Sequence, residues 1–204
     1  LDAINRDFVS GRNVIAFLND DNIIPAQVKA GKKLEDARGY VTGGCWEVIL
    51  EGHEHSAGAN CYFNLLRIMD MSIHDHPEIE REAGVVCKKI DHSEDFESVY
   101  EIVLNNVIGN IRKMCMTIQR NGSIWSQVNP APFFSACLSD CLKNHKDYTA
   151  GGGRYNPHGL PLAGFANFIN SLLVIRHLCF ENSNCYLAEL LQAVRADWVG
   201  YENL

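Results

Sequence analysis

Apolar residues recur at helical spacing in several long stretches of the chain, and capping or breaking residues bound most of them. This pattern predicts long helices over residues 60–74, 93–119, 133–144, 163–179 and 186–198. In the second of these, Ser93 is the expected N-cap. Two short helices are predicted over residues 25–30, with Pro25 in the first turn, and over residues 34–38, closed by Gly39.

Extended structure is predicted in fewer places. The apolar run after Gly11 ends at a polar cluster, residues 19–22, and is typical of a buried strand followed by a turn. A further strand is expected at residues 84–87. Residues 149–159 form a glycine-rich loop. Without a repeat, a low-complexity tract or a linker, residues 1–204 are expected to form a single partial domain.

Charge and hydropathy narrow the classes of partner. The chain has 18 basic and 25 acidic residues and a formal net charge of −7, with no basic cluster to follow a phosphate backbone, so no nucleic acid partner is expected. Its apolar runs are far shorter than the roughly 20 residues that span a bilayer, and its first residues lack a signal-peptide pattern. We therefore expect no membrane partner and a cytoplasmic location.

Eight cysteines are many for such a chain, but no two of them form a CxxC pair. In a chain of this size they are expected to be reduced thiols. Cys137, Cys141 and His145 follow one another at i, i+4 spacing and are a candidate metal site. Buried structural cysteines are the favoured interpretation, and no metal site is predicted.

The glycine-rich loop fits neither of the common phosphate-binding patterns. Arg154 follows its three glycines where a Walker loop requires Gly-Lys-Ser/Thr, and the GxGxxG order is also missing. The glycines permit a structural turn or a backbone that lies against a substrate or another loop. Arg154, Tyr155 and Asn156 are expected to position the loop rather than to touch substrate.

The strongest candidate for chemistry is the sequence Gly43-Gly44-Cys45-Trp46-Glu47. Two glycines allow a tight turn, Trp46 can wall a pocket, and Glu47 lies on the same side as Cys45 in an extended segment. That arrangement suits a thiol used in one-electron chemistry. A buried structural thiol and a cysteine hydrolase served by His53 or His55 remain alternatives, although these two histidines and His158 are expected to face solvent or lie in loops.

Several blocks of the chain together resemble one known family. Seven blocks are similar, in order and spacing, to blocks of the glycyl radical enzymes, the pyruvate formate-lyase family. They are Asn19-Asp20, residues 34–38, Gly44-Cys45-Trp46-Glu47, and residues 140–142, 151–156, 171–175 and 197–202. The resemblance runs from about Gly11 to Leu204. An ordered series of blocks is more specific than any single motif.

The resemblance implies a radical mechanism. Cys45 matches the cysteine whose thiyl radical abstracts hydrogen from substrate, and Glu47 matches the general base of the members that eliminate water, an amine or sulfite. A glycyl radical, installed by an S-adenosylmethionine iron-sulfur activase, is the implied cofactor. The implied partners are a small-molecule substrate, this radical SAM activase and, in a homodimer, a second copy. The implied parent protein is an anaerobic lyase or dehydratase.

The implied fold is α/β: part of a ten-stranded barrel, helix-rich around the cysteine loop. The segment that bears the radical glycine is not found in these residues, so the chain is expected to be an internal fragment, inactive alone. A non-catalytic truncated paralogue or interaction domain is therefore a further alternative. Trp46 and Tyr62 are expected to line the substrate pocket. Ala59 stands where glycerol-type dehydratases carry an aspartate, which disfavours glycerol as substrate.

Overall fold

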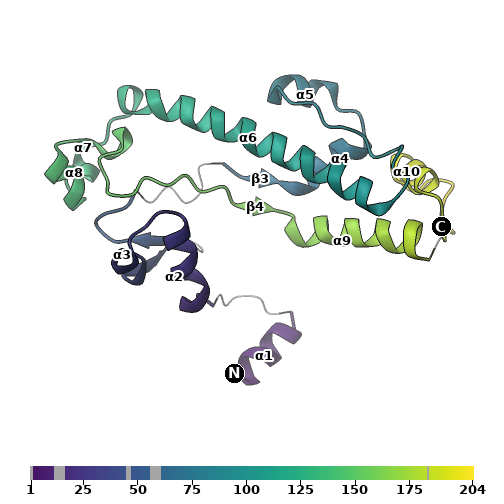
Figure 1. Cartoon of the computed structure of the whole chain (residues 1–204), viewed down its shortest axis with the longest axis horizontal. Helices are drawn as coiled ribbons and strands as arrows, with labels where there is room; N and C mark the ends of the chain where they lie inside the picture. Colours follow the sequence, from purple (N-terminus) through teal and green to yellow (C-terminus); the bar gives the residue numbers. More distant parts are fainter. Residues whose placement is uncertain (1, 12–16, 45–46, 56–60, 183) are drawn as a thin grey trace. The chain divides into compact units, whose positions relative to one another are not determined.

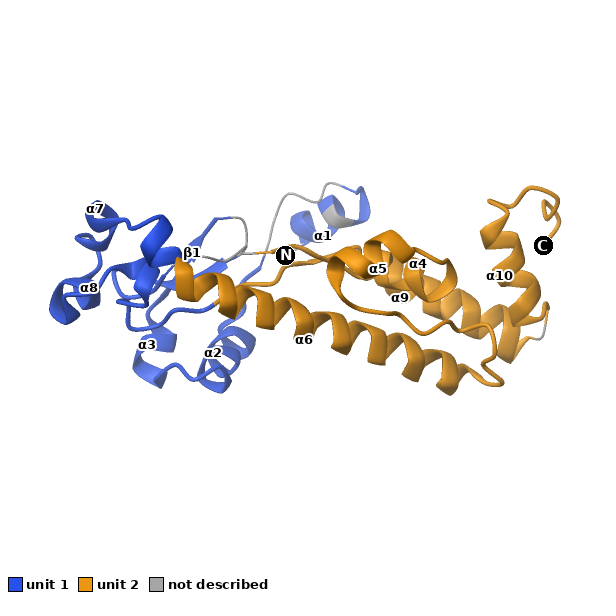
Figure 2. Cartoon of the chain, turned by 90° about the horizontal axis from the view of Figure 1, so that it is seen from above, with its two compact units in different colours: residues 1–58, 125–157 blue, residues 59–124, 158–204 orange. Residues whose placement is uncertain are grey.

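The computed structural model describes residues 2–11, 17–44, 47–55, 61–182 and 184–204. The chain forms two compact units, each built from two segments of sequence (Figure 1, Figure 2). Unit 1 comprises residues 1–58 and 125–157, and unit 2 comprises residues 59–124 and 158–204. The glycine-containing hairpin belongs to unit 1, and most of the long helices belong to unit 2.

Unit 1 is built around a two-stranded antiparallel sheet. Strands β1 (Tyr40–Gly43) and β2 (Glu47–Leu50) pair in a register that runs from Tyr40 opposite Leu50 to Gly43 opposite Glu47. The other elements of the unit are α1 (Asp2–Val9), α2 (Asp20–Lys29), α3 (Leu34–Arg38), α7 (Pro132–Ser135), α8 (Ser139–Asn144) and the short 3-10 helix η1 (Tyr148–Ala150).

The polar cluster at residues 19–22 begins a helix, and the predicted turn there is wrong. Asn19 is the N-cap of α2, and its side-chain oxygen accepts a hydrogen bond of 3.0 Å from the Asp21 amide. Asparagine and aspartate favour both turns and helix N-termini, so composition alone did not separate the two. Pro25 consequently lies inside α2 and not in its first turn. The predicted strand falls largely on residues 12–16, outside the described residues.

Unit 2 contains the longer helices and a second, very short sheet. The parallel strands β3 (Phe63–Asn64) and β4 (Leu162–Ala163) pair, and each leads into a helix. The helices are α4 (Leu65–Ile73), α5 (Pro77–Ala83), α6 (Phe96–Val128), whose last residues belong to unit 1, α9 (Phe165–Ile175), the π-helical η2 (Arg176–Glu181) and α10 (Leu187–Arg195).

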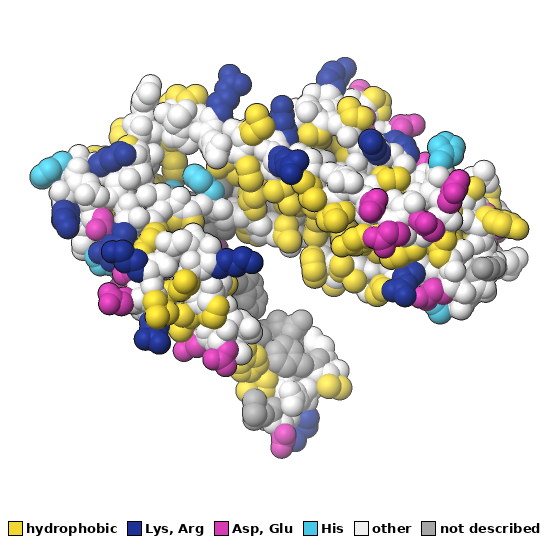
Figure 3. All heavy atoms as spheres, viewed as in Figure 1, with side chains coloured by type: hydrophobic (Ala, Val, Ile, Leu, Met, Phe, Trp, Pro, Cys, Tyr) yellow, Lys and Arg dark blue, Asp and Glu magenta, His cyan; other side chains and the backbone are white. Residues whose placement is uncertain are grey.

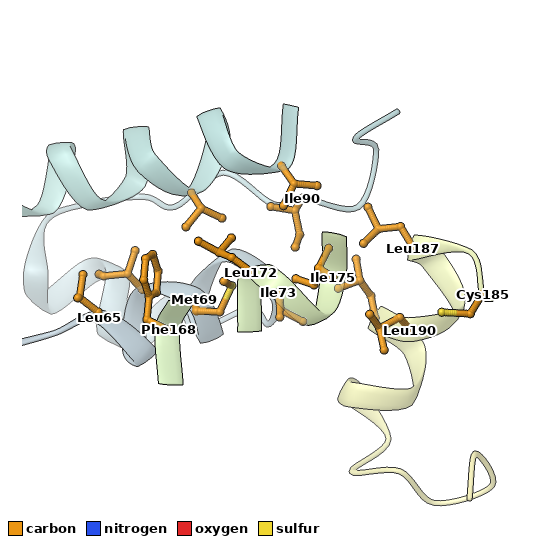
Figure 4. Close-up of a cluster of buried hydrophobic side chains, with 14 of the residues drawn as sticks. Leu65, Met69, Ile73, Ile90, Phe168, Leu172, Ile175, Cys185, Leu187 and Leu190 are labelled. Carbon is orange, nitrogen blue, oxygen red and sulfur yellow. The ribbon is translucent and has the colours of Figure 1, made fainter. Parts of the chain in front are cut away.

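One hydrophobic core holds unit 2 together. Figure 4 shows side chains of α4, α9 and α10 pointing toward one another, with Ile90 beside them. Val99 of α6, Ile90 and Leu191 are 0 to 1% exposed. The stripes predicted for these helices are confirmed as the buried faces, because residues at i, i+3 and i+4 lie on one side of a helix.

Several predicted boundaries in unit 2 are corrected by local capping. Helix α6 begins after Asp95, whose carboxylate accepts the Ser98 amide at 2.8 Å, so Ser93 is not its cap. Helix α4 begins at Leu65 because Asn64 caps it. The strand predicted at residues 84–87 is absent: α5 ends at Gly84 in the left-handed conformation, and the residues after it pair with no strand among the described residues.

The remaining predicted elements agree with the structure in part. Helix α3, closed by Gly39, is confirmed, whereas the helix predicted over 133–144 is broken into α7 and α8. The helix-rich character is confirmed, and the described strands form two separate pairs. No described helix is long and apolar enough to cross a membrane. Each of the cysteines described, all except Cys45, is a free thiol.

Candidate functional site

The candidate site begins at the tip of the β1–β2 hairpin. Gly43 and Glu47 form the last pair of the ladder, and Gly44 follows with φ +57°, a conformation that favours glycine. A Cβ atom on Gly44 would lie 2.2 Å from Glu47 Oε2, so the carboxylate lies directly over the Gly44 backbone. Cys45 and Trp46, the other predicted residues of the tip, lie outside the described residues.

A buried ion pair supports the base of the hairpin. The Glu54 carboxylate pairs with the Lys32 ammonium and also accepts the Leu50 amide at 2.7 Å, at the end of β2. The Lys32 and Glu54 side chains are 9% and 1% exposed, and Lys32 also donates to Gln27 Oε1 at 2.8 Å. Buried charges need such partners, so this arrangement fixes β2 against the end of α2.

A second polar network joins four separate stretches of sequence in unit 1. Arg154 donates from Nη1 to Asp36 Oδ1 at 2.8 Å, and its Nε lies 3.3 Å from Asp140 Oδ2. His53 Nδ1 lies 2.5 Å from the same Asp140 oxygen. The Tyr155 hydroxyl donates to Asp36 at 2.7 Å and accepts the Lys33 amide at 3.0 Å. We call this set the Asp36–Asp140 network.

Electrostatics within unit 1 favour ionised carboxylates. The hydrogen bond from Tyr155 lowers the pKa of Asp36, burial opposes this, and the Arg154 guanidinium lowers the pKa further. Burial alone would raise the pKa of Asp147, but hydrogen bonds from Thr149 outweigh it and lower the pKa. Both aspartates therefore stay charged at neutral pH and hold their donors in place.

The glycine-rich loop is packed against backbone. A Cβ on Gly152 would lie 2.0 Å from the Lys146 carbonyl oxygen, so only glycine fits there. The loop then pairs with the segment after the hairpin, because the amides of Arg154 and His55 donate to the carbonyls of His53 and Tyr155 at 2.8 and 3.0 Å. The loop thus lies against other backbone of unit 1, and Arg154 and Tyr155 connect it to Asp36. The role of these two residues in positioning the loop, rather than in touching substrate, stays a prediction.

His53 and His55 lie in a loop, as expected, but neither side chain faces fully into solvent. His55 is 6% exposed and packs against the rings of Trp125 and Tyr148, at centroid distances of 5.5 and 4.8 Å. His53 is half-buried and paired with Asp140. The side chains face inward because the backbone of residues 53–55 is hydrogen bonded to the glycine-rich loop.

The remaining candidate residues differ in their surroundings. Tyr62 is 71% exposed, just before β3 in unit 2. Cys137 is exposed whereas Cys141 is buried, and these two with His145 do not form a cluster of metal-ligating groups within the described part of the chain.

Sequence reasoning missed the residues that support the hairpin. Lys32 and Glu54 are 22 residues apart, and Asp36 and Arg154 are 118 apart, so no periodic or motif signal connects them. Arg154 was expected to position the glycine-rich loop, but its partners were not identified. Asp36, Asp140 and Arg154 each occur in one of the blocks that resemble the glycyl radical enzymes.

The chain is similar to known enzymes over almost its whole length. Residues 4–204 match the family described as pyruvate formate lyase-like. A (2S)-3-sulfopropanediol dehydratase of Klebsiella oxytoca is 31% identical over 91% of this chain and 23% of the relative. A trans-4-hydroxy-L-proline dehydratase of Clostridioides difficile is 28% identical over 92% of this chain and 24% of the relative.

Solved structures give the same likeness in space. A structure described for 1,2-propanediol dehydration in Roseburia inulinivorans has a TM-score of 0.79 at 28% identity, over 91% of this chain and 23% of that one. The B12-independent glycerol dehydratase of Clostridium butyricum has a TM-score of 0.79 at 26% identity, over 92% and 24%. The chain thus spans about a quarter of the length of the proteins it matches.

Proposed function

Since the chain belongs to the pyruvate formate lyase-like family, we propose that it forms the cysteine-loop part of a glycyl radical enzyme that cleaves a C–O, C–N or C–C bond of a small polar metabolite. The observation that carries the proposal is the hairpin tip: Glu47 closes the ladder and places its carboxylate over Gly44, one residue before Cys45.

Cys45 acts as a hydrogen-atom relay in this proposal. The unpaired electron would come from a glycyl radical, the cofactor that the family implies. The Cys45 S–H bond would break as its hydrogen atom passes to that radical, and the thiyl sulfur would then take a hydrogen atom from a substrate C–H bond. After the substrate radical has reacted, the Cys45 thiol would give its hydrogen atom to the product radical, and the thiyl sulfur would take a hydrogen atom back from the glycine, so that each hydrogen atom and the unpaired electron are accounted for.

Glu47 moves the proton. As a carboxylate it accepts a proton from the substrate radical while the leaving group departs from the neighbouring carbon, and the protonated acid then gives that proton to the leaving group. Cys45 and Glu47 thus divide the work between one-electron and proton transfer. The position of Glu47 as the first residue of a paired strand supports this role, because the ladder fixes its backbone.

The surrounding unit supports a rigid site. The buried Lys32–Glu54 pair and the Asp36–Asp140 network connect the base of the hairpin to segments of unit 1 that are distant in sequence. Reactive groups need to be held to a fraction of an ångström, and second-layer hydrogen bonds provide such restraint. An activating radical SAM enzyme as partner, a homodimeric parent protein, a cytoplasmic location and anaerobic use belong to this proposal.

The substrate class follows from the relatives. Those named above act on sulfopropanediol and hydroxyproline, and the solved structures concern propanediol and glycerol. All are small molecules with a hydroxyl group. We therefore favour dehydration of a small hydroxylated metabolite. Trp46 and Tyr62 are the proposed pocket residues, and Ala59, outside the described residues, argues against glycerol.

The test uses the full-length protein after anaerobic treatment with its activase. Electron paramagnetic resonance is expected to show a glycyl doublet, and the protein is expected to dehydrate at least one member of a panel of small diols, sulfonated diols and hydroxyprolines. Cys45→Ala should keep the doublet and abolish turnover. Cys137→Ala is the matched control, because Cys137 is exposed, and it should keep both. A missing doublet, or turnover by Cys45→Ala, would overturn the proposal.

A further inference from the structure

A second group of ionisable side chains lies in unit 2, at the end of α4. Asp70 and His74 are one helical turn apart on this helix, and His76 is the N-cap residue of α5. Asp70 Oδ1 lies 2.8 Å from His74 Nδ1, and Asp70 Oδ2 lies 2.8 Å from His76 Nε2. One ligand atom from each of the three residues lies within 4.8 Å of the others. The three groups therefore converge on one point.

We infer that Asp70, His74 and His76 bind a divalent transition-metal ion, with Zn²⁺ as the best fit. Two imidazoles and one carboxylate are a ligand set that proteins use for zinc and related ions. Bonds of about 2.0–2.2 Å at roughly tetrahedral or octahedral angles would separate neighbouring ligand atoms by about 3 Å. The two observed separations from Asp70, both 2.8 Å, are close to this value, and the two histidine nitrogens lie within 4.8 Å of each other.

The backbone around the cluster is held in place by other cations. Lys89 Nζ donates to the Met71 carbonyl at 2.8 Å and also to the His74 carbonyl. Arg195 donates to the Ile73 carbonyl at 2.7 Å and pairs with Asp91 at 2.6 Å. These contacts fix the end of α4, so the ligands are positioned before an ion arrives.

The cluster is accessible from solvent and adjoins a cavity. The side chains of Asp70, His74 and His76 are 34, 31 and 26% exposed. Asp70 and His74 also line a cavity of about 520 Å³ between α4, α9 and α10, whose other walls are mainly apolar. The His76 Nε2 atom itself is buried, so an ion would reach the cluster past the partly exposed Asp70 and His74. The coordination positions that the three residues leave open would be available to water or to a small anionic ligand.

One cation already competes for the carboxylate. Arg67 Nη1 lies 2.9 Å from Asp70 Oδ2, and its side chain is about half exposed. A metal ion must displace or share this contact. Removing the guanidinium should therefore increase metal affinity, a result that a merely structural Asp70–histidine hydrogen-bond cluster would not give.

The chain contains a matched control for the test. His177 and Glu181 also form a histidine–carboxylate pair at i, i+4, with Nδ1 3.4 Å from Oε2, and no third ligand is grouped with them in the described part of the chain. Substituting His177 removes a histidine of the same kind from the same unit. Any metal bound through scattered surface histidines should respond equally to either change.

The experiment titrates the full-length, chelator-treated protein with Co²⁺, followed by visible absorption, and then displaces Co²⁺ with Zn²⁺. We expect the wild type to bind one equivalent of Co²⁺ per chain. In His74→Gln and in His76→Gln the affinity for Co²⁺ should fall at least about 10-fold, so that this equivalent is lost. His177→Gln should bind as the wild type does, and Arg67→Gln should bind more tightly. Zn²⁺ should raise the melting temperature of the wild type and not that of His74→Gln.

Two outcomes would overturn the site. One is a wild-type protein that binds no stoichiometric Co²⁺ or Zn²⁺. The other is an equal response of His74→Gln and His177→Gln, which would mark surface binding only. Circular dichroism of each variant separates loss of the site from loss of the fold. The glycyl doublet and turnover involve other residues, so this test is independent of the proposed function.

Discussion

The two units of the chain achieve order by different means. Unit 2 packs a continuous cluster of leucine, isoleucine, valine and phenylalanine side chains between its helices (Figure 4). No described residue of unit 1 belongs to that cluster, and the hairpin that unit 1 carries is fixed by the buried Lys32–Glu54 pair and by the Asp36–Asp140 network.

The difference has a functional meaning. Hydrophobic packing is strong but tolerates shifts, because it lacks direction. Hydrogen bonds and ion pairs have strict geometry, so they define the position of a strand more sharply. Unit 2 adds directional contacts, such as those of Lys89 and Arg195, to its hydrophobic core, whereas in unit 1 such contacts hold the hairpin that carries the candidate chemistry. Phe165 and Leu173 of α9 are exposed, so unit 2 also carries apolar surface. Figure 3 shows hydrophobic side chains on the face of the molecule that it displays.

The largest effect is expected from Glu54→Gln. The change leaves the Lys32 ammonium buried without its carboxylate, which should cost about 4 kcal/mol of local stability. Hydrogen exchange of peptides from β2 and α2 measures this loss. The double variant Lys32→Met with Glu54→Gln should recover part of it, because no charge is then left buried. A double variant that loses the sum of the single effects would contradict the account.

A comparable core change in unit 2 should act differently. Leu191→Ala removes a side chain that is 1% exposed and should cost about 3 kcal/mol. The volume-conserving Leu191→Met should cost less than about 1.5 kcal/mol. Hydrogen exchange should rise in peptides of α4 and α9. If the β1–β2 peptides responded as strongly, the two units would not be separately stabilised.

Gly152→Ala tests the close approach in the glycine-rich loop. The new Cβ would meet the Lys146 carbonyl oxygen, so the backbone must shift at a cost of about 2 kcal/mol. The control is Gly122→Ala on α6, where nothing lies within 4 Å. That helical change should stabilise by roughly 0.5 kcal/mol. Denaturant unfolding of both variants measures the opposite signs, and equal signs would refute the packing argument.

The smallest effect concerns pH and Asp36. Because its folded pKa is lowered, Asp36 contributes stability above its unfolded pKa of about 3.9, and that contribution is lost as pH falls through the lowered value. Because the Asp36 carboxylate lies near the surface, its contribution to the free energy of unfolding is about 1 kcal/mol at most. Asp36→Asn should weaken unit 1 at pH 7 and reduce the loss of its stability as pH falls below about 4. Asp147, whose pKa is also lowered, should keep part of that loss in the variant. Unfolding curves at several pH values test this.

Regular spacing is the part of the fold that the sequence made predictable. The helices around Leu65, Phe168 and Leu190 were expected because their apolar residues recur along one face. The start of α2 was misjudged, because Asn19 can begin either a turn or a helix. The cluster at Asp70 had only a partial signal, because His74 follows Asp70 at i, i+4 spacing whereas His76 lies beyond the end of α4, at the start of α5.

The support of the candidate site could not be predicted in the same way. The tight turn at Gly43 and Gly44 was expected from local sequence, as was the importance of Glu47, but the paired strands on either side of the turn were not predicted. The partners beneath it, Lys32 with Glu54 and Asp36 with Arg154, meet only because distant segments fold together. Local sequence therefore identifies the loop that carries Cys45 and Glu47. The residues that hold this loop can be found only from tertiary contacts.

The most direct test of the central claim is the turnover of Glu47→Gln beside that of Glu51→Gln, in the full-length activated protein. Both changes neutralise a carboxylate at or next to β2, but Glu51 is exposed in the turn after the strand. The account predicts that both variants keep the glycyl doublet, that Glu51→Gln turns over normally and that Glu47→Gln loses at least about 100-fold in rate. Normal turnover by Glu47→Gln would contradict it.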